Sequence, residues 1–462
     1  MSIIFQKIML EEIGQIVTGK TPSSNVIGAF SSSGIPFVTP KDMDGRRWIE
    51  TTERYLSEAG RQSLKNYLVP KDSVAVSCIG SDMGKAILLK KDSVTNQQIN
   101  TIIVDASKHN PKYIYYVLSL KQEELKSIAG GSATPILNKG HFSKVVIELP
   151  DKVDQDNIVQ VLDSLDCKIE LNNQINQNLE SMAQAIFKSW FIDFEPVRAK
   201  IAAKQEGKDT ELAAMCAISG KSEAELKQMA EDDLAELQET ASLFPDELVE
   251  SELGEVPKGW EVNSLGNICN FTPGSAFKPE YQGQTQGEIP FIKVSDMNLN
   301  GNEIFIVKAN NYIDSSLQKE RKFKLHEEGA TVFAKIGVAL ISNRRRVLTM
   351  PTIIDNNMMS ASPLKGLSTP YYLYLLLKTI DFNTLVSGTA LPYLNVSDLR
   401  KILIVHPIIN LLNKFELMAN PLLQKIKLNS MQCEGLVTLR DNLLPKLLSG
   451  EIDASVLNGE HG

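Results

Sequence analysis

Two stretches of the chain repeat each other: SATPILNKGHFSKVVIELP at residues 132–150 and TALPYLNVSDLRKILIVHP at residues 389–407. Pro135 of the first stretch matches Pro392 of the second, at an offset of 257 residues. An internal repeat of this length indicates that one structural unit is used twice. The repeat therefore decides the fold, because each half of the chain has to be interpreted against the other.

The repeat extends in both directions from these stretches. Upstream, IPFVTPKDM begins at Ile35 and IPFIKVSDM begins at Ile289. Downstream, KIELN begins at Lys168 and KIKLN begins at Lys425, again 257 residues apart. Each half thus carries a globular block followed by one long helical segment.

The two helical segments have the periodicity of long amphipathic helices. Their apolar residues recur at spacings of three and four, which places them on one face of a helix. They are Ile158, Val161, Leu162, Leu165, Ile169, Ile175, Leu179, Met182, Ile186 and Trp190 in the first segment, and Leu412, Phe415, Leu422, Ile426, Leu436, Leu439, Leu443 and Leu447 in the second. The pattern favours packing of the two helices on each other; the alternative is two separate helices, each on its own globular core. Asn420 and Pro421 interrupt the second segment, so a break or kink is expected there.

Short apolar runs such as SVAVSCI, TIIVD, ATVFAKI and ILIVH predict strands mixed with helices in the globular blocks. The expected fold class is therefore α+β, with two mixed α/β blocks and an internal repeat. The expected boundaries are a first block at 1–150, a first long helix at 151–197, an acidic helical connector at 198–257, a second block at 258–407, a second long helix at 408–450 and a tail at 451–462.

The composition is that of a globular protein, with 43% hydrophobic and 23% charged residues among 462. The net charge of -8 is unevenly spread: residues 1–150 hold 18 Lys and Arg against 14 Asp and Glu, and residues 260–407 hold 15 against 12. Residues 151–259 hold only 10 against 24. The five scattered cysteines and the absence of a signal or membrane-spanning pattern predict a cytoplasmic protein. Two mildly basic blocks flank one acidic segment, and such blocks suit nucleic-acid binding.

The stretch GQIVTGKT at Gly14–Thr21 fits the pattern of a phosphate-binding loop, G-x-x-x-x-G-K-[ST]. A turn-forming run of proline, serine and asparagine follows it, where such a loop needs a helix. In the aligned second half Gly19 falls on Gly274, but Lys20 falls on Ser275. Because a phosphate loop cannot lose its lysine, a stand-alone P-loop NTPase or nuclease is the weaker alternative.

Four longer stretches carry a resemblance to a known family. They are AIFKSWFIDFEPV from Ala185, SELGEVPKGWE from Ser251, SGTALPYLNVSDLRKI from Ser387 and LRDNLLPKLLSGEI from Leu439. They are long and unusual, and they occur in the order found in that family. The chain resembles the specificity subunit of type I restriction–modification systems over essentially its whole length.

The resemblance implies two target recognition domains separated by two long antiparallel helices, related by a pseudo-two-fold axis. Each domain is then expected to read one half of a split double-stranded DNA site. The resemblance also implies two modification subunits, which methylate adenine with S-adenosylmethionine, and restriction subunits that use ATP and Mg. The chain itself is expected to be non-catalytic and to bind no cofactor.

DNA binding needs Lys and Arg near phosphates and polar side chains at base edges. In the first block the candidates are Lys20, Ser23, Lys41, Ser77, Ser81, Lys85, Gln97, Ser132, Thr134 and Lys139. In the second block they are Lys278, Lys293, Lys335, Arg344, Arg345, Arg346, Thr389 and Tyr393. The run NRRRV is the sharpest basic cluster; for each candidate the alternative is a solvated surface position. The edges of the blocks match while their interiors differ, which predicts two different half-sites.

The ends of the long helices are expected to form a subunit interface, through Phe187, Trp190, Phe191, Leu444, Leu447 and Leu448. Asn172 and Asn429 lie near the helix middles, 257 residues apart. They are either a buried polar pair that fixes the helix register or two exposed side chains. A helix of about 36 residues is about 54 Å long, which bounds the distance between the readers at roughly 16 base pairs. The target should therefore contain unread bases between its halves.

Overall fold

The structure is a computed structural model that describes residues 3–128, 136–388 and 392–457. The chain forms two compact units: unit 1 contains Met1–Lys168 and Leu436–Gly462, and unit 2 contains Ile169–Gly435. The first block lies in unit 1 and the second block in unit 2, and each unit includes part of both long helices.

Unit 1 is built on a five-stranded sheet in the order β2-β11-β8-β9-β5. All four residues of β8 (Val74–Ser77) are buried. This is expected for a central strand covered on both faces, because the sequence of such a strand is a nearly continuous apolar run. A second sheet has the order β3-β6-β4-β10-β7, and β1 pairs with β12. The other strands are β1 (Gln6–Met9), β2 (Gly14–Thr18), β3 (Phe30–Ser31), β4 (Ile35–Val38), β5 (Trp48–Ile49), β6 (Arg54–Leu56), β7 (Leu68–Val69), β9 (Ala86–Leu89), β10 (Ser93–Thr95), β11 (Ile99–Val104) and β12 (Val146–Leu149).

The short helices of unit 1 are α1 (Leu10–Ile13), α2 (Glu58–Ser63), α3 (Pro111–Ser119), α4 (Gln122–Ile128) and α5 (Lys139–Ser143), and α17 (Ala454–Leu457) follows the second long helix. α3 begins where the sequence dictates: the Asn110 side chain accepts from the Lys112 N–H at 2.9 Å, and Pro111 occupies the first turn. The core packs α3, α5 and the ends of both long helices against the main sheet, with Tyr113 and Phe142 fully buried.

Unit 2 repeats this arrangement. Its main sheet has the order β16-β23-β20-β21-β18, a smaller sheet has the order β19-β17-β22, and β15 pairs with β26. The strands are β13 (Leu248–Ser251), β14 (Gly254–Pro257), β15 (Glu261–Ser264), β16 (Cys269–Pro273), β17 (Ile289–Ile292), β18 (Phe305–Ile306), β19 (Tyr312–Ile313), β20 (Thr331–Ala334), β21 (Arg346–Leu348), β22 (Ile353–Ile354), β23 (Met358–Pro363), β24 (Val386–Ser387), β25 (Tyr393–Leu394) and β26 (Leu403–His406). The short helices of this block are α11 (Leu265–Ile268), α12 (Ser315–Arg321), α13 (Val338–Ile341), α14 (Pro370–Thr379) and α15 (Val396–Arg400). The α+β class expected from the repeat is confirmed.

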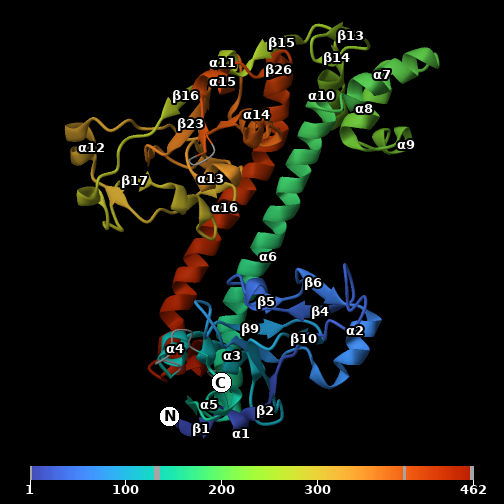
Figure 1. Cartoon of the computed structure of the whole chain (residues 1–462). Coiled ribbons are helices and arrows are strands. Elements are labelled where there is room, and N and C mark those ends of the chain that lie inside the picture. The colour runs from blue at the N-terminus through green and yellow to red at the C-terminus, as the bar shows by residue number, and fades with distance from the viewer. Residues whose placement is uncertain (1–2, 129–135, 389–391, 458–462) are drawn as a thin grey trace. The chain divides into compact units, whose positions relative to one another are not determined.

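The two long helices are α6 (Lys152–Phe191) and α16 (Ile409–Leu448), each of 40 residues. In unit 2 they run side by side and antiparallel (Figure 1), because Phe187 near the end of α6 contacts Phe415 near the start of α16, with ring centroids 5.9 Å apart. The preference for mutual packing over separate helices therefore holds within this unit.

The break expected at Asn420 and Pro421 is absent, because α16 continues through both residues. Proline removes one N–H from the helix and leaves the carbonyl four residues earlier without its partner. That carbonyl belongs to Leu417, whose side chain is 63% exposed, so water can reach this face of the helix. The solvent-facing position explains how the proline is tolerated.

Asn172 and Asn429 are buried in unit 2, at 1% and 3% exposure. They do not bond to each other. The Asn172 amide donates to the Gln432 side-chain oxygen at 2.8 Å, and the Asn429 amide donates to the Asn176 side-chain oxygen at 2.9 Å. Of the two alternatives, exposure is excluded, and the buried asparagines do not form the expected pair, because each bonds to another residue of the facing helix. The polar layer satisfies its own hydrogen bonds inside an apolar seam.

The connector contains α7 (Glu195–Gln205), α8 (Thr210–Ser219), α9 (Glu223–Leu226) and α10 (Glu231–Ser242), followed by the β13–β14 hairpin. Lys200 is buried inside it, with its ammonium 2.6 Å from Glu211 and 2.9 Å from the Phe244 carbonyl oxygen. A buried ammonium requires such partners, since an unpaired charge in the interior is strongly unfavourable. Among the described residues, no helix is both long enough and apolar enough to cross a membrane.

Candidate nucleic-acid interface

Most candidate DNA contacts of the first block lie on loops at one end of its main sheet. β2 ends at Thr18, opposite Asn100 near the start of β11, and β8 ends at Ser77, opposite Ile99. β9 begins opposite the end of β8. Backbone pairing thus gathers the residues that follow Thr18, follow Ser77 and precede Ile99 at the same edge.

The glycine turn at this edge is held by close backbone contacts. The Gly19 N–H donates to the Ile99 carbonyl oxygen at 3.1 Å, and the Lys20 N–H donates to the Thr95 carbonyl oxygen at 2.8 Å. A Cβ placed on Gly19 would lie 2.2 Å from the Asn96 carbonyl oxygen, so only glycine fits. A strand precedes the turn and no helix begins at Lys20, which is not the geometry of a phosphate-binding loop.

The second block has the same turn at Gly274. The Gly274 N–H donates to the Met358 carbonyl oxygen at 3.2 Å, and the Ser275 N–H donates to the Ile354 carbonyl oxygen at 2.8 Å. A Cβ on Gly274 would lie 2.0 Å from the carbonyl oxygen of Asp355. The shared feature of the two halves is therefore a tightly packed loop corner.

A second backbone tie also repeats. The Leu137 N–H donates to the Cys78 carbonyl oxygen at 3.0 Å in the first block, and the Leu394 N–H donates to the Lys335 carbonyl oxygen at 2.8 Å in the second. These bonds fasten the residues just before α5 and α15 to the loop between the third and fourth strands of each main sheet in chain order. The described parts of the repeated stretches are thus tied to the candidate interface through Leu137 and Leu394.

In the first block, most of the predicted contacts that the structure describes lie at this end, with different exposures. The exposed residues are Lys20, Ser23, Lys41, Ser81, Gln97 and Lys139, and Lys85 is half-buried. Ser77 is fully buried, and its hydroxyl has no hydrogen-bond partner in the described part of the chain. Ser132 and Thr134 lie outside the described residues. Gln97 is held in place, since its side-chain oxygen accepts from the Thr21 hydroxyl at 2.6 Å.

In the second block, Lys278, Arg344 and Tyr393 are exposed, and Lys293, Lys335 and Arg346 are half-buried. The Lys293 ammonium lies 5.1 Å from the centroid of the Phe277 ring and bonds to the Gln282 side-chain oxygen. Thr389 lies outside the described residues. The turn facing Gly274 carries Asp355, and burial raises the pKa of this carboxyl, although the Asn357 N–H and the charges of Lys293 and Lys335 lower it.

The three arginines of NRRRV have different environments. Arg345 is 3% exposed, and its guanidinium lies 3.5 Å from the centroid of the Phe382 ring. Burial lowers the pKa of Arg345 to about 9. Arg346 donates to the carbonyl oxygens of Met297 at 3.2 Å and Arg345 at 2.9 Å. Only Arg344 is exposed, so the sequence run overstated the number of arginines available to DNA.

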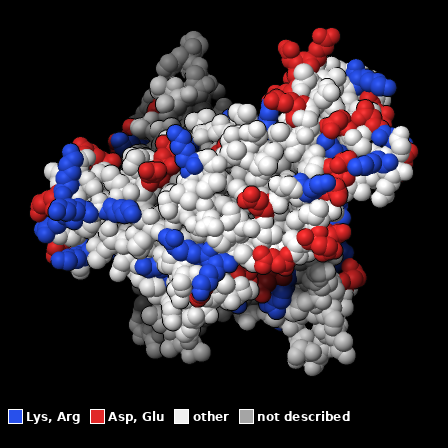
Figure 2. Space-filling view, turned by 90° about the horizontal axis from the view of Figure 1, so that it is seen from above, with Lys and Arg blue, Asp and Glu red and all other residues white. Residues whose placement is uncertain are grey.

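The sequence reasoning missed a basic surface formed by the end of α12 and the residues that follow it. Figure 2 shows Lys and Arg side chains gathered at the left edge of unit 2, on the side where Figure 1 places α12. The exposed residues there are Lys319, Arg321, Lys322 and Lys324. The run KERKFK at 319–324 is a visible charge signal, but an isolated charge run is also typical of a solvated helix.

The residues expected at a subunit interface are buried inside the chain. Phe187, Trp190 and Phe191 belong to an aromatic core in unit 2, and the Phe191 and Phe415 ring centroids lie 5.1 Å apart. Leu444 and Leu447 are buried in the core of unit 1, and Leu448 packs against it. Their role in binding another subunit stays a prediction, but a substitution there acts first on the packing of this chain.

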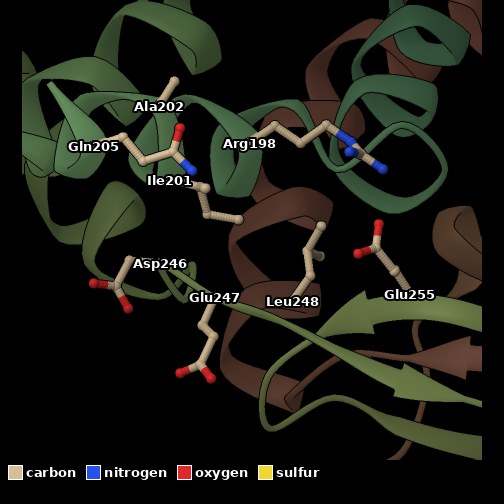
Figure 3. A pocket seen from close by; sticks show the side chains of 8 residues that line it. All are labelled: Arg198, Ile201, Ala202, Gln205, Asp246, Glu247, Leu248 and Glu255. Carbon is tan, nitrogen blue, oxygen red and sulfur yellow. The ribbon is translucent and has the colours of Figure 1, made fainter.

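An open pocket of about 470 Å³ lies in the connector of unit 2. It is lined by Arg198, Ile201, Ala202, Gln205, Asp246, Glu247, Leu248 and Glu255, and the Arg198 guanidinium points toward the Glu255 carboxylate (Figure 3). The three carboxylates outnumber the single arginine, so the pocket is poorly suited to a phosphate. Within the described ranges, no group of three His, Cys, Asp or Glu side chains is placed to hold a metal ion.

Comparison with known proteins assigns these features to a family. The family model of the type I restriction modification DNA specificity domain matches residues 4–181 and 257–411. The chain is similar to the type I restriction enzyme HindI specificity subunit of Haemophilus influenzae, with 32% identity over 93% of this chain and 97% of that protein. It is also 29% identical to the type I restriction enzyme MjaIX specificity subunit of Methanocaldococcus jannaschii, over 96% of this chain and 92% of that one.

The fold is found among solved structures. The crystal structure of a type-I restriction-modification system S subunit from M. genitalium matches with a TM-score of 0.53 at 15% identity. The match covers 96% of each chain. At this identity the likeness concerns the fold alone, and it supports the same arrangement of mixed domains and long helices.

Proposed function

The chain belongs to the family of type I restriction modification DNA specificity proteins, and from this premise we propose that each globular block reads one half of a split double-stranded DNA target. The observation that carries the proposal is the repeated loop end: two sheets of the same strand order present lysine, arginine and amide side chains on matched loops. No finding favours a stand-alone P-loop NTPase or nuclease.

The side chains at these ends suit two different tasks in DNA binding. Lysines such as Lys20, Lys41 and Lys278 are exposed point charges that can neutralise phosphates and set affinity. Arg344 and Gln97 carry forked polar groups, which can form paired hydrogen bonds to guanine and adenine in the major groove. Ser77 and Arg345 are buried and are left out of the proposed contact set.

We propose that the chain itself performs no chemistry and acts with two modification subunits and with restriction subunits. S-adenosylmethionine would be bound by the modification subunits, and ATP and Mg by the restriction subunits. An exposed apolar row on α16, formed by Leu417, Leu428 and Met431 at 63%, 60% and 52% exposure, supports docking of a protein partner on the outer face of this helix. Such a complex would act on DNA in the cytoplasm.

The long helices would set the distance between the two half-sites. Each has 40 residues, which corresponds to about 60 Å at about 1.5 Å per residue. At about 3.4 Å per base pair this limits the separation of the readers to roughly 18 base pairs. The recognised sequence should therefore contain a spacer whose bases are not read.

The test is a genome-wide map of methylated adenines in the host, made with the wild-type chain and with a variant shortened by one turn in each long helix. Removing residues in register from α6 and α16 should shorten the spacer while both half-sites persist. A map without any split motif would reject DNA reading by this chain. An unchanged spacer in an assembled complex would reject the helices as the element that sets the distance.

A further inference from the structure

A buried arginine holds the loop between β20 and β21 in the second block. The Arg345 Nη2 donates to the Asn343 side-chain oxygen at 2.9 Å and to the Ile380 carbonyl oxygen at 3.0 Å. Its guanidinium stacks on the Phe382 ring at 3.5 Å from the centroid. Both acceptors and the ring lie at or near the ends of elements, so the arginine joins the loop to the segment that follows α14.

The same loop is tied to that segment by two further bonds. Asn343 has a left-handed backbone with φ of 54°, a conformation that asparagine adopts more readily than most residues. Its side-chain oxygen also accepts from the Phe382 N–H at 3.1 Å, and the Asn383 amide donates to the Ile341 carbonyl oxygen at 3.3 Å. The turn around Asn343 is therefore fixed by a small network with Arg345 at its centre.

This network is not the least costly way to fill the interior. Burying a guanidinium removes it from water, and one of its donors, Nε, has no partner among the described residues. An apolar side chain of similar size would avoid that cost but could not bond to Asn343 and Ile380. The Ile380 carbonyl lies at the C-terminal end of α14, where the helix dipole favours a cation. The arrangement therefore gives up stability in exchange for a defined loop position.

The loop position determines how the neighbouring arginine is displayed. Arg344 is the exposed member of the run, while Arg346 bonds to carbonyl oxygens of its own block. We infer that Arg345 is a positioning residue for DNA recognition, which holds the turn at 343–346 so that Arg344 is presented to the half-site of the second block. This inference rests on the proposed function, since it assigns a role within the same interface.

In the first block, neutral groups link the corresponding loop to the start of α4. The Gln122 amide, at the start of α4, donates to the Met83 carbonyl oxygen at 3.0 Å, and Met83 is fully buried. A Cβ on Gly84 would lie 2.8 Å from the Gln122 carbonyl oxygen, so the loop lies directly against this helix start. In both blocks the loop is fastened to the segment that follows a matched short helix, α3 in the first block and α14 in the second. The chemistry of the fastening differs, and in the second block it depends on Arg345.

The experiment selects bound duplexes from a random pool with the full-length chain, purified from its host with the subunits that accompany it. Arg345→Lys keeps the charge but loses the planar stack and the forked geometry. Asn343→Gly keeps the left-handed turn but removes the shared acceptor. Each variant should weaken base discrimination in one half of the target by roughly fivefold to a hundredfold, the value of one base contact. The other half should be unchanged.

Two controls separate positioning from general effects. Arg344→Ala should relax the same half-site, because it removes the side chain that Arg345 is inferred to present. Arg345→Lys should leave the salt slope unchanged. Lys365→Ala removes one exposed charge after β23, at the far end of the same sheet, and should change neither preference nor salt slope.

The outcomes are distinct. Wild-type preference in both Arg345→Lys and Asn343→Gly, with or without a lower melting temperature, would show that Arg345 serves packing alone. If the wild-type chain enriches a split sequence and the variants do not alter it, only this inference fails. If the wild-type chain enriches no sequence at all, the proposed function fails and the inference fails with it.

Discussion

The two blocks share a strand order but are fixed to the long helices by different chemistry. In unit 1 a charged network joins them: Arg47 bonds to Asp163 at 2.5 Å, and Arg440 bonds to Asp166 at 2.8 Å. Asp163 and Asp166 lie on α6, Arg440 lies on α16, and Arg47 belongs to the first block. These ion pairs are largely buried and supplement the apolar core that packs both helix ends against the main sheet of unit 1.

In unit 2 the helix ends meet in an aromatic core, at the positions where unit 1 has the aliphatic residues Ile158 and Leu447. Trp190 and Phe191 of α6 pack against Phe415 of α16, with ring centroids 6.0 Å and 5.1 Å away. Phe191 also contacts Tyr372 of α14 at 5.1 Å. The repeat therefore preserves the backbone pairing and the tight turns at Gly19 and Gly274. The side chains that attach each block to the long helices, and those proposed to contact DNA, differ between the two halves.

The largest expected effect tests whether the blocks read independently. Replacing residues 258–407 with the equivalent block of a related specificity subunit should exchange one half of the methylated sequence completely and leave the other half unchanged. The reason is that each main sheet and its loop end lie within one compact unit. Methylated-adenine mapping measures the result, and a change in both halves would contradict independence.

A second prediction compares the two cores at matched positions. Trp190→Ala in unit 2 should destabilise that unit by about 3–5 kcal/mol, because a large buried ring leaves a cavity. Leu447→Ala, 257 residues later in unit 1, should cost about 2–5 kcal/mol there. Hydrogen exchange locates each loss: protection should fall in β23 for the first variant and in β11 for the second. Equal loss in both units from either substitution would indicate a single cooperative core.

The sequence was sufficient for the scaffold because the repeat encodes backbone requirements. Gly19 and Gly274 are matched since both sit where a side chain would collide with a carbonyl oxygen. The amphipathic stripes predicted the long helices for the same reason, as burial needs apolar residues every third or fourth position. The sequence could not identify the packing partners of the helix ends, because Trp190 is apolar whether another subunit or the aromatic core of its own chain surrounds it.

The site was predicted less well, because a run of charged residues does not show which of its side chains are exposed in the folded protein. NRRRV contains three arginines in a row, but only the folded loop determines that Arg345 turns inward to Phe382 and Arg344 outward. For the same reason, the basic surface at the end of α12 was not predicted. The break expected at Pro421 failed for a related reason, since its effect depends on whether the freed carbonyl faces water.

The two units should differ in their stability toward acid. Burial would raise the pKa of Asp163, but hydrogen bonds from Lys112 and Arg47 outweigh it, and the pKa lies below its usual value of 3.8. A carboxyl with a lowered folded pKa stabilises the protein above about 3.8 and loses that contribution as pH falls through the folded pKa. In unit 2, burial raises the pKa of Glu416, so its protonation on acidification has the opposite sign. Unit 1 should therefore loosen first as pH falls below about 4.

Tryptophan fluorescence can follow this order. Trp48 lies beside the network, with its ring centroid 5.5 Å from the Arg47 guanidinium carbon, whereas Trp190 and Trp260 belong to the core of unit 2. The fluorescence of the wild-type chain should show an early component in its acid transition, and this component should be lost in Trp48→Phe. Simultaneous loss of signal from both units would contradict the difference in anchoring.

The smallest expected effect concerns the residue that made the first turn look like a phosphate-binding loop. Lys20 is exposed, and its ammonium lies 5.3 Å from the centroid of the Tyr67 ring. The matched residue after Gly274 is Ser275, so the two blocks differ by one charge at the same turn. If Lys20 contacts a phosphate, Lys20→Ala should lower the salt slope of DNA binding by about 1 without altering the recognised sequence. Ser275→Lys should raise that slope by about 1, because it places the same charge on the same backbone. The comparison also tests the competing function: ATP hydrolysis by the purified chain that disappears in Lys20→Ala would show that the first turn binds a nucleotide after all.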